Sequence, residues 1–204
     1  SAVSSAASGV ALNGAFFLQP LALSTDDLGS ETWVECAVRA VGTFEVRSGG
    51  AEPQEPTAHC SGQAAVAEAS TWRPADTAAA QRRCSSAADR GAFYSGFAAT
   101  GLQYGPAFRR VEAVWGCGEE VAARLERRAA LQGTQVHPAG LDGALQSTAL
   151  LARGDGSGGE TRLPFAVDVA CLRGVAAGLL QVAVVAQGAK AADVSLAAGA
   201  EGRA

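Results

Sequence analysis

The sequence has 204 residues, of which 48% are hydrophobic and 18% charged, and its formal net charge is −4 at pH 7. This balance indicates a soluble globular protein with enough length for a hydrophobic core, and it excludes an intrinsically disordered chain. The acidic charge and the lack of a basic stripe argue against nucleic acid as a partner. No apolar run is long enough to cross a membrane, and the first residues lack the basic and hydrophobic regions of a signal peptide.

The first third of the chain alternates in polarity and predicts an antiparallel meander of strands. Val10–Leu23 contains a glycine and a proline, which favour a strand with an edge or a bulge. Trp33–Ser48 alternates apolar and polar side chains and predicts one long half-buried strand, interrupted at Gly42. A loop at Gly49–Pro56 then precedes a returning strand at Thr57–Val66.

The middle of the chain changes in character. Residues 68–88 are rich in alanine and in polar or charged residues, and they predict a linker. Asp89 is placed to cap a short helix that ends at Gly101, and a tight turn with several aromatic residues follows. Two strands are expected after that turn, at Arg110–Cys117 and Glu120–Arg128.

The strongly apolar stretch Val136–Gln146 predicts a buried helix. Pro138 suits the first turn of a helix, where its missing N–H is not needed. Asp142 and Gln146 are four residues apart, so they share one face of that helix. A carboxylate in apolar surroundings is costly unless it is paired or used, and this helix is therefore the candidate functional element.

The remainder of the chain predicts strands that surround this helix. Three are expected, at Leu163–Leu172, Leu179–Ala186 and Ala192–Ala197. A sheet wrapped around a single buried helix is the natural packing of such elements.

The five cysteines are scattered, and no two of them have the spacing of a zinc-binding pair. Their odd number and irregular spacing predict no disulfide framework and no metal site. We instead expect buried free thiols in a reducing compartment, which corresponds to a cytoplasmic protein. The five are Cys36, Cys60, Cys84, Cys117 and Cys171.

Three motifs occur in a fixed order in the second half of the chain. They are Y-G-P-A-F at Tyr104–Phe108, H-P-A-G-L-D-G-A-L-Q at His137–Gln146 and L-P-F at Leu163–Phe165. In this order and spacing they resemble the dehydratase domain of modular polyketide synthases. Two shorter segments, Phe16–Leu21 and His59–Gly62, resemble strands of that domain's N-terminal half.

The resemblance implies an α+β fold, the double hotdog, in which two antiparallel sheets each wrap on a helix. It assigns residues 10–67 to a partial N-terminal hotdog, 68–88 to a linker and 89–204 to a C-terminal hotdog. The first hotdog is expected to be incomplete, because the sequence does not contain its long helix. On the same grounds the sequence is expected to be a fragment truncated at both ends.

The resemblance also implies an activity. The family removes water from a β-hydroxyacyl thioester on the phosphopantetheine arm of an acyl carrier protein and leaves an α,β-unsaturated acyl chain. No cofactor is then expected to bind the domain directly. The implied partners are the carrier protein and neighbouring synthase domains, with a homodimer through the parent synthase and neither nucleic acid nor membrane.

Within this resemblance Asp142 matches the catalytic acid, Gln146 matches its companion amide, and Tyr104 matches a tyrosine that helps to hold the acid. An aspartate in an apolar tunnel has a raised pKa, and its protonated form can donate to a departing hydroxyl. The other residues expected to support the site are Gly105, Pro106 and His137, and those expected to line an acyl tunnel are Leu141, Leu145, Pro164 and Phe165.

The family's base is a histidine in an H-x-x-x-G-x-x-x-x-P motif, which this sequence lacks. Of its two histidines, His59 is expected to be a core or edge-strand residue and His137 to cap or pack against the helix. The fragment is therefore expected to be inactive unless the base comes from upstream sequence. Two alternatives stay open: a non-catalytic double hotdog that serves as a scaffold or holds the acyl chain, and a related cyclisation-directing domain of the product-template or pyran-forming kind.

Overall fold

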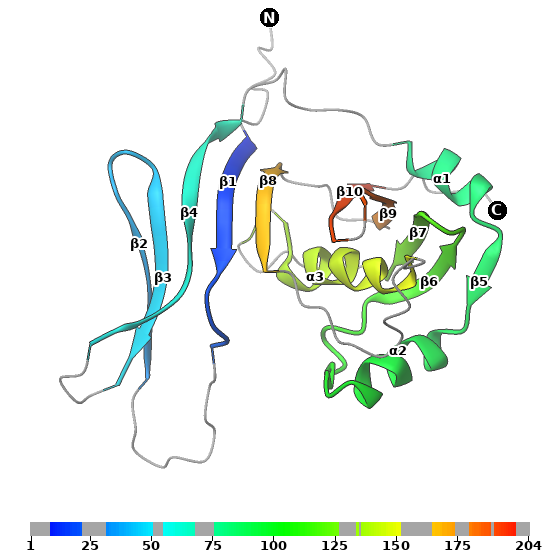
Figure 1. Cartoon of the computed structure of the whole chain (residues 1–204), viewed down its shortest axis with the longest axis horizontal. Helices are drawn as coiled ribbons and strands as arrows, with labels where there is room; N and C mark the ends of the chain where they lie inside the picture. The colour runs from blue at the N-terminus through cyan, green and yellow to red at the C-terminus, as the bar shows by residue number, and fades with distance from the viewer. Residues whose placement is uncertain are drawn as a thin grey trace, which may run out of the picture. The chain divides into compact units, whose positions relative to one another are not determined.

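The computed structural model describes residues 9–21, 32–50, 55–67, 76–126, 134, 136–151, 165–173, 180–188 and 190–198. The chain divides into two compact units. Unit 1 comprises Ser1–Trp72 and Arg162–Arg173, and unit 2 comprises Arg73–Thr161 and Gly174–Ala204. Each unit is built on a five-stranded antiparallel sheet (Figure 1). In the described ranges no helix combines the length and the apolar character needed to cross a membrane.

The sheet of unit 1 has the strand order β2-β3-β4-β1-β8. Its strands are β1 Gly9–Phe17, β2 Trp33–Val38, β3 Thr43–Gly49, β4 Thr57–Ala67 and β8 Ala166–Leu172. All neighbouring strands pair antiparallel, as the alternating sequence predicts. The strands do not form a simple meander, however, because β1 lies between β4 and β8 and not beside β2.

The single long strand predicted for Trp33–Ser48 is wrong. The segment forms a hairpin of β2 and β3, joined by a turn in which the Gly42 N–H donates to the Arg39 carbonyl oxygen at 2.8 Å. Gly42 has a φ of 84°, in the left-handed region that glycine adopts without strain. A side chain there would also clash with the carbonyl oxygen of Ala64. Gly42 therefore reverses the chain, whereas the strand prediction treated it as a local interruption.

Strand β8 does not belong to the C-terminal sheet, in contrast to the expected assignment of residues 89–204. It pairs antiparallel with β1, from Val10 opposite Leu172 to Phe16 opposite Ala166. The Phe16 and Phe165 rings meet edge-on, with 6.3 Å between their centroids. A strand's polarity pattern defines its two faces but not its neighbours in the sheet, so the sequence could not reveal this pairing.

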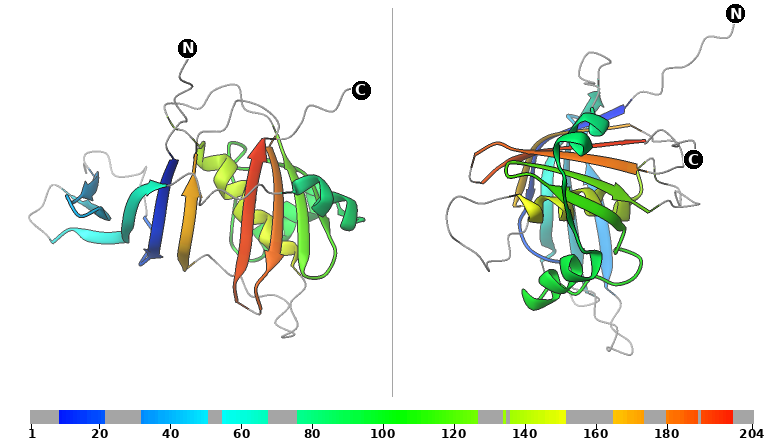
Figure 2. Two further views of the ribbon diagram at one scale, coloured as in Figure 1. Left: turned by 90° about the horizontal axis from the view of Figure 1, so that it is seen from above. Right: turned by 90° about the vertical axis from the view of Figure 1, so that its right-hand side faces the viewer.

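The sheet of unit 2 has the strand order β10-β9-β7-β6-β5. The elements of this unit are α1 Thr77–Arg83, β5 Ser86–Ala88, α2 Arg90–Ala99, β6 Val111–Gly116, β7 Glu120–Leu125, α3 Pro138–Gln146, the 3-10 helix η2 Ser147–Leu150, β9 Leu180–Ala186 and β10 Ala192–Ala198. Figure 2 shows α3 along one face of this sheet, where it packs on β7 and β10. The predicted packing of one apolar helix on a sheet is confirmed for this unit.

The predicted linker is wrong for residues 76–88, and residues 68–75 lie outside the described residues. Helix α1 begins where the Asp76 carboxylate accepts the Ala79 N–H at 2.8 Å, and it buries Thr77 and Ala80. Strand β5 pairs with β6 and forms an edge of the sheet. Alanine-rich segments are compatible with both a linker and a short amphipathic helix, and burial against the sheet selects the helix.

The core of unit 2 lies between the sheet and helices α2 and α3. Its largest fully buried side chains are Val111, Val114, Val121, Leu125, Val182 and Val184. Burial of each such side chain contributes about 1.5–3 kcal/mol. A Cβ atom at Gly143 would lie 3.3 Å from the Leu125 side chain, so the glycine lets α3 approach β7 closely. The buried Ala144 completes this contact face.

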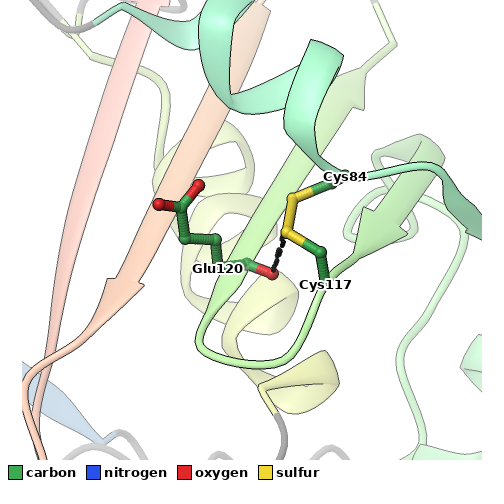
Figure 3. Close-up of side chains that lie close together, drawn as sticks. All are labelled: Cys84, Cys117 and Glu120. Carbon is green, nitrogen blue, oxygen red and sulfur yellow. Dashed lines mark hydrogen bonds between the residues drawn. A yellow bond between two sulfur atoms is a disulfide. The ribbon is translucent and has the colours of Figure 1, made fainter.

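Cys84 and Cys117 form a disulfide, with 4.8 Å between their Cα atoms, and the prediction of free thiols is wrong for this pair (Figure 3). Cys84 ends α1, and Cys117 lies in the turn between β6 and β7. Tertiary packing brings the two cysteines together, and their separation of 33 residues in the sequence does not predict this contact. Cys36, Cys60 and Cys171 are free, as predicted, but Cys36 is exposed and the other two are half-buried.

We expect reduction of this disulfide to destabilise unit 2. The two cysteines are 33 residues apart, and the chain entropy of a loop of that size corresponds to about 3–4 kcal/mol. Amide hydrogen exchange of β6 and β7, compared between oxidised and reduced protein, measures the change within this unit. Substitution of the exposed Cys36 by serine is the control and should leave this protection unchanged. Equal protection with and without reductant would contradict the prediction.

Candidate active site

Helix α3 begins as the sequence predicts. Pro138 occupies the first turn, and His137 precedes it as the N-cap. The His137 Nδ1 atom accepts the Ala139 N–H at 3.0 Å, which satisfies one of the free donors at the start of the helix. The predicted capping role of His137 is therefore confirmed.

Asp142 and Gln146 lie on one face of α3 and contact each other, as predicted. Gln146 Nε2 donates to Asp142 Oδ2 at 2.6 Å. The same nitrogen donates to the Phe108 carbonyl oxygen at 3.1 Å, and Gln146 Oε1 accepts the Tyr94 hydroxyl at 3.1 Å. The Gln146 residue is only 3% exposed. Its amide is therefore buried with both hydrogens and its oxygen engaged, and it has one fixed orientation.

The Y-G-P-A-F motif reaches this pair through its main chain. The Phe108 N–H donates to the Gly105 carbonyl oxygen at 3.0 Å and closes a turn that includes Pro106. This turn carries the Phe108 carbonyl that accepts from Gln146. Gly105 and Pro106 thus belong to the turn, and they act on the Asp142–Gln146 pair through Phe108.

Among the described residues, the hydrogen bond from a tyrosine to this pair comes from Tyr94 and not from the predicted Tyr104. Tyr94 lies on α2, is 7% exposed, and its hydroxyl also accepts the Val111 N–H at 3.0 Å. The Tyr104 ring packs edge-on against Phe97 and Tyr94, with centroid distances of 5.1 and 6.3 Å. Tyr94 has a recognisable signal in the sequence, because Phe93 and Phe97 mark the buried face of α2 on which it also lies.

Burial shapes the acidity of the groups around Asp142. It raises the pKa of the half-buried Asp142 carboxyl above its ordinary value, and the hydrogen bond from Gln146 opposes this rise. Burial also raises the pKa of Tyr94 and of Tyr104, and the negative charge of Asp142 adds to both shifts. The arrangement combines burial, which favours the protonated carboxyl of Asp142, with a neighbouring N–H, which favours its carboxylate.

The described structure does not test the prediction that four residues line an acyl tunnel. Leu141 and Leu145 lie on α3 in unit 2, and Leu141 is exposed. Phe165 is 68% exposed and belongs to unit 1, and Pro164 lies outside the described residues. A hollow of about 660 Å³ lies in unit 1 and is lined by Asn13, Phe16, Arg47, Ser61 and Gln63, among others, but by none of these four residues. The tunnel therefore stays a prediction.

One group in unit 2 has the spacing of a metal site. Ligand atoms of Cys84, Cys117 and Glu120 lie within 4.8 Å of one another. Metals bind the thiolate form of cysteine, and here both sulfur atoms are joined in the disulfide. The Glu120 carboxylate points away from the sulfur atoms in Figure 3 and pairs with Arg83 at 2.8 Å. The group therefore acts as a cross-link between α1 and the start of β7.

Comparison with known proteins agrees with this arrangement. The family model of the polyketide synthase dehydratase N-terminal domain matches residues 73–204. The chain belongs to the polyketide synthase dehydratase family. The match includes α2, the Y-G-P-A-F motif and α3, which contribute every residue of the cluster around Gln146.

Curated relatives of this dehydratase chain are multidomain polyketide synthases. The spectinabilin polyketide synthase system protein NorA' of Streptomyces orinoci is 39% identical over 108 residues, which is 52% of this chain and 3% of NorA'. The polyketide synthase GfsE of Streptomyces halstedii is 45% identical over 71 residues, which is 32% of this chain and 2% of GfsE. The chain thus spans a small fraction of the length of these relatives.

Solved dehydratase structures share the fold. The dehydratase domain of the CurJ module of the curacin polyketide synthase has a TM-score of 0.73 at 25% identity, covering 94% of this chain and 70% of that domain. An inactive aspartate-to-asparagine mutant of the CurK dehydratase has a TM-score of 0.77 at 19% identity, covering 93% of this chain and 70% of the CurK chain. The predicted α+β double-hotdog fold is confirmed.

The raised pKa of Asp142 predicts a pH-dependent stability. The folded chain binds the proton of the Asp142 carboxyl more tightly than the unfolded chain does. The contribution of this proton to the stability of the fold is therefore fully present below the pKa of the unfolded chain, about 3.9, and it is lost as the pH rises through the pKa of the folded chain. Asp142→Asn replaces the carboxyl by an amide that does not titrate, so it avoids this loss and should be more stable than the parent sequence at neutral pH. The difference should shrink as the pH falls toward the unfolded pKa, which urea denaturation at a series of pH values would show. A lower stability of the variant at neutral pH would contradict this.

Gln146→Leu should destabilise the chain, because it removes partners from the Asp142 carboxylate, the Phe108 carbonyl and the Tyr94 hydroxyl. Each buried polar group left unsatisfied costs about 1–3 kcal/mol, and three groups lose a partner, so we expect a total loss of at least about 3 kcal/mol. Gln187→Leu is a matched control, because Gln187 donates to Asp193 at 2.7 Å on the exposed surface. The control should change the free energy of unfolding by less than about 0.5 kcal/mol. An equal loss of unfolding free energy in the two variants would show that the buried hydrogen bonds of Gln146 contribute no more to stability than an exposed one.

Proposed function

We propose that this domain supplies the proton donor for the dehydration of a β-hydroxyacyl thioester, presented on the phosphopantetheine arm of an acyl carrier protein. The observation that carries the proposal is the half-buried Asp142 carboxyl, whose pKa is raised and which accepts a 2.6 Å hydrogen bond from Gln146. This pair lies on the helix that contains the family's H-P-x-x-x-D-x-x-x-Q pattern, within the region matched by the family model.

The reaction needs an acid and a base. The base removes the α-proton, the electron pair of that C–H bond forms the α,β double bond, and the β-hydroxyl leaves with the proton of Asp142 as water. Burial raises the pKa of Asp142, which favours its protonated form as the donor. The Gln146 N–H then stabilises the carboxylate that forms, so the two effects act at successive stages of one proton transfer.

Two variants of a structural neighbour support the choice of an aspartate. The solved CurK dehydratase includes one mutant in which histidine is replaced by phenylalanine and one in which aspartate is replaced by asparagine, and both are described as inactive. That enzyme therefore requires a histidine and an aspartate. We take Asp142 as the equivalent of its aspartate.

The base of the proposed reaction is not among the two histidines of this sequence. His59 is buried in β4, where Nδ1 donates to the Gln19 carbonyl oxygen at 3.2 Å and Nε2 accepts the Ser48 hydroxyl at 2.8 Å. A carbonyl oxygen can only accept, and this assigns the ring proton to Nδ1. His137 caps α3 through its own Nδ1. We propose that a residue of the parent protein outside these 204 residues provides the base.

The partners and the location follow from the same proposal. The acyl carrier protein delivers the substrate, and the domain binds no cofactor of its own. Neighbouring synthase domains lie in the same polypeptide, since the relatives are long polyketide synthases. We further propose that the parent synthase forms a homodimer and is located in the cytoplasm.

A second candidate function is a non-catalytic domain that holds the acyl chain. The engagement of both His59 and His137 in hydrogen bonds within the fold favours it, because neither ring is available to remove a proton. In this case the parent would bind a β-hydroxyacyl carrier and release it with unchanged mass.

The two candidates differ in a direct assay. The parent protein is incubated with a β-hydroxyacyl carrier protein, and mass spectrometry detects the loss of one water from the acyl chain. We expect the parent to dehydrate the substrate and Asp142→Asn to lower the rate by a factor of about 10²–10⁴. Asp193→Asn is the control, because Asp193 forms the exposed pair with Gln187, and it should keep the parental rate.

The 204-residue chain alone should not dehydrate the substrate, because the base is absent. Turnover by this chain would overturn the claim about the base. Full activity of Asp142→Asn in the parent would overturn the assignment of the acid. Binding of the carrier without loss of water would establish the non-catalytic function.

A further inference from the structure

The Tyr94 hydroxyl lies at one end of a directed series of hydrogen bonds that leads to Asp142. The Val111 N–H donates to the Tyr94 oxygen at 3.0 Å. A main-chain N–H can only donate, so the single hydroxyl proton of Tyr94 is directed to Gln146 Oε1, at 3.1 Å. This leaves the NH₂ group of Gln146 facing Asp142 Oδ2 at 2.6 Å. The direction of every bond in the series is therefore fixed.

We propose that Tyr94 is a positioning residue, which holds the Gln146 amide with its NH₂ group toward Asp142; its role in turnover rests on the proposed function of Asp142. Tyr94 is 7% exposed and acts through Gln146, not through contact with substrate.

The orientation of the amide matters because its two ends have opposite effects on a carboxyl group. An N–H directed at Asp142 stabilises the carboxylate, whereas a carbonyl oxygen in the same place would stabilise only the protonated form. The Phe108 carbonyl favours the observed orientation, because it accepts the other N–H of Gln146 at 3.1 Å. That acceptor is a main-chain group, so Tyr94 is the side chain on which the orientation can be tested.

The Tyr94 ring is itself held in place by packing. The Phe93 ring lies edge-on to it at a centroid distance of 5.2 Å, and the Arg109 guanidinium lies over the ring at 5.7 Å from its centroid. Buried rings in such contacts occupy one rotamer, which restricts the hydroxyl to a narrow range of positions. The hydroxyl can therefore act as a fixed donor.

The test is a pH titration of Asp142 in the 204-residue chain, followed by carboxyl ¹³C NMR and by the side-chain NH₂ signals of Gln146. Tyr94→Phe keeps the ring and removes the hydroxyl, and it should raise the Asp142 pKa. The shift should have the same direction as in Gln146→Leu but be smaller. Tyr104→Phe is the matched control, because it also removes one tyrosine hydroxyl near the site, whereas the hydroxyl bonded to Gln146 is that of Tyr94, and it should leave the Asp142 titration unchanged.

A second measurement avoids any loss of folding in Tyr94→Phe. The sequence contains two tyrosines, so fluorotyrosine incorporated into Tyr104→Phe labels Tyr94 alone. Ring fluorination makes the hydroxyl a stronger donor to Gln146 Oε1, which should make the Gln146 N–H a stronger donor as well. The Asp142 pKa should then fall, opposite in sign to the effect of Tyr94→Phe.

An unchanged Asp142 pKa in both modified proteins would overturn the positioning role. An equal shift in Tyr104→Phe would also overturn it, because that variant leaves the hydrogen bond from Tyr94 to Gln146 in place. These titrations require no substrate, so they do not depend on dehydration by the parent. If the Asp142 pKa shifts but the parent does not dehydrate the substrate, the positioning role stands and the proposed function fails. If the parent dehydrates the substrate but the Asp142 pKa does not shift, the proposed function stands and the positioning role fails.

Discussion

The buried amide of Gln146 is the interaction on which the arrangement of unit 2 depends. It joins three separate parts of the chain, since its partners lie on α3, on α2 and in the turn that ends at Phe108. A buried amide that loses a partner is destabilised by more than the bond contributed, because the remaining polar atom cannot return to water. The three segments are therefore held in one relative position, and Asp142 is held with them.

The same network explains how an apolar helix accommodates an aspartate. Gly143 and Ala144 bring α3 close to β7, which removes water from the neighbouring face of the helix. Burial raises the pKa of Asp142 and so disfavours its charged form. The hydrogen bond from the Gln146 N–H stabilises the charged form of Asp142 and lowers its pKa. Packing and hydrogen bonding thus act on this carboxyl in opposite directions.

The features that sequence reasoning recovered are those determined within a few residues. Pro138 marks the start of α3, and the spacing of Asp142 and Gln146 places them on one face, because helix geometry is local. Tyr94 was missed because its link to Gln146 spans 52 residues, and no local pattern reports such a contact. The Cys84–Cys117 bond and the pairing of β8 with β1 were missed for the same reason.

The return of β8 to the sheet of unit 1 means that the two units are interleaved along the chain. Strand β8, Ala166–Leu172, pairs with β1 in unit 1, whereas β9 and β10, which follow it in the sequence, belong to unit 2. A cut near residue 73, where the family match begins, would remove β1 and leave β8 without its partner strand. An unpaired strand of this kind exposes a row of free N–H and carbonyl groups that can recruit other chains. The boundary of sequence similarity is therefore not a boundary at which this protein can be divided.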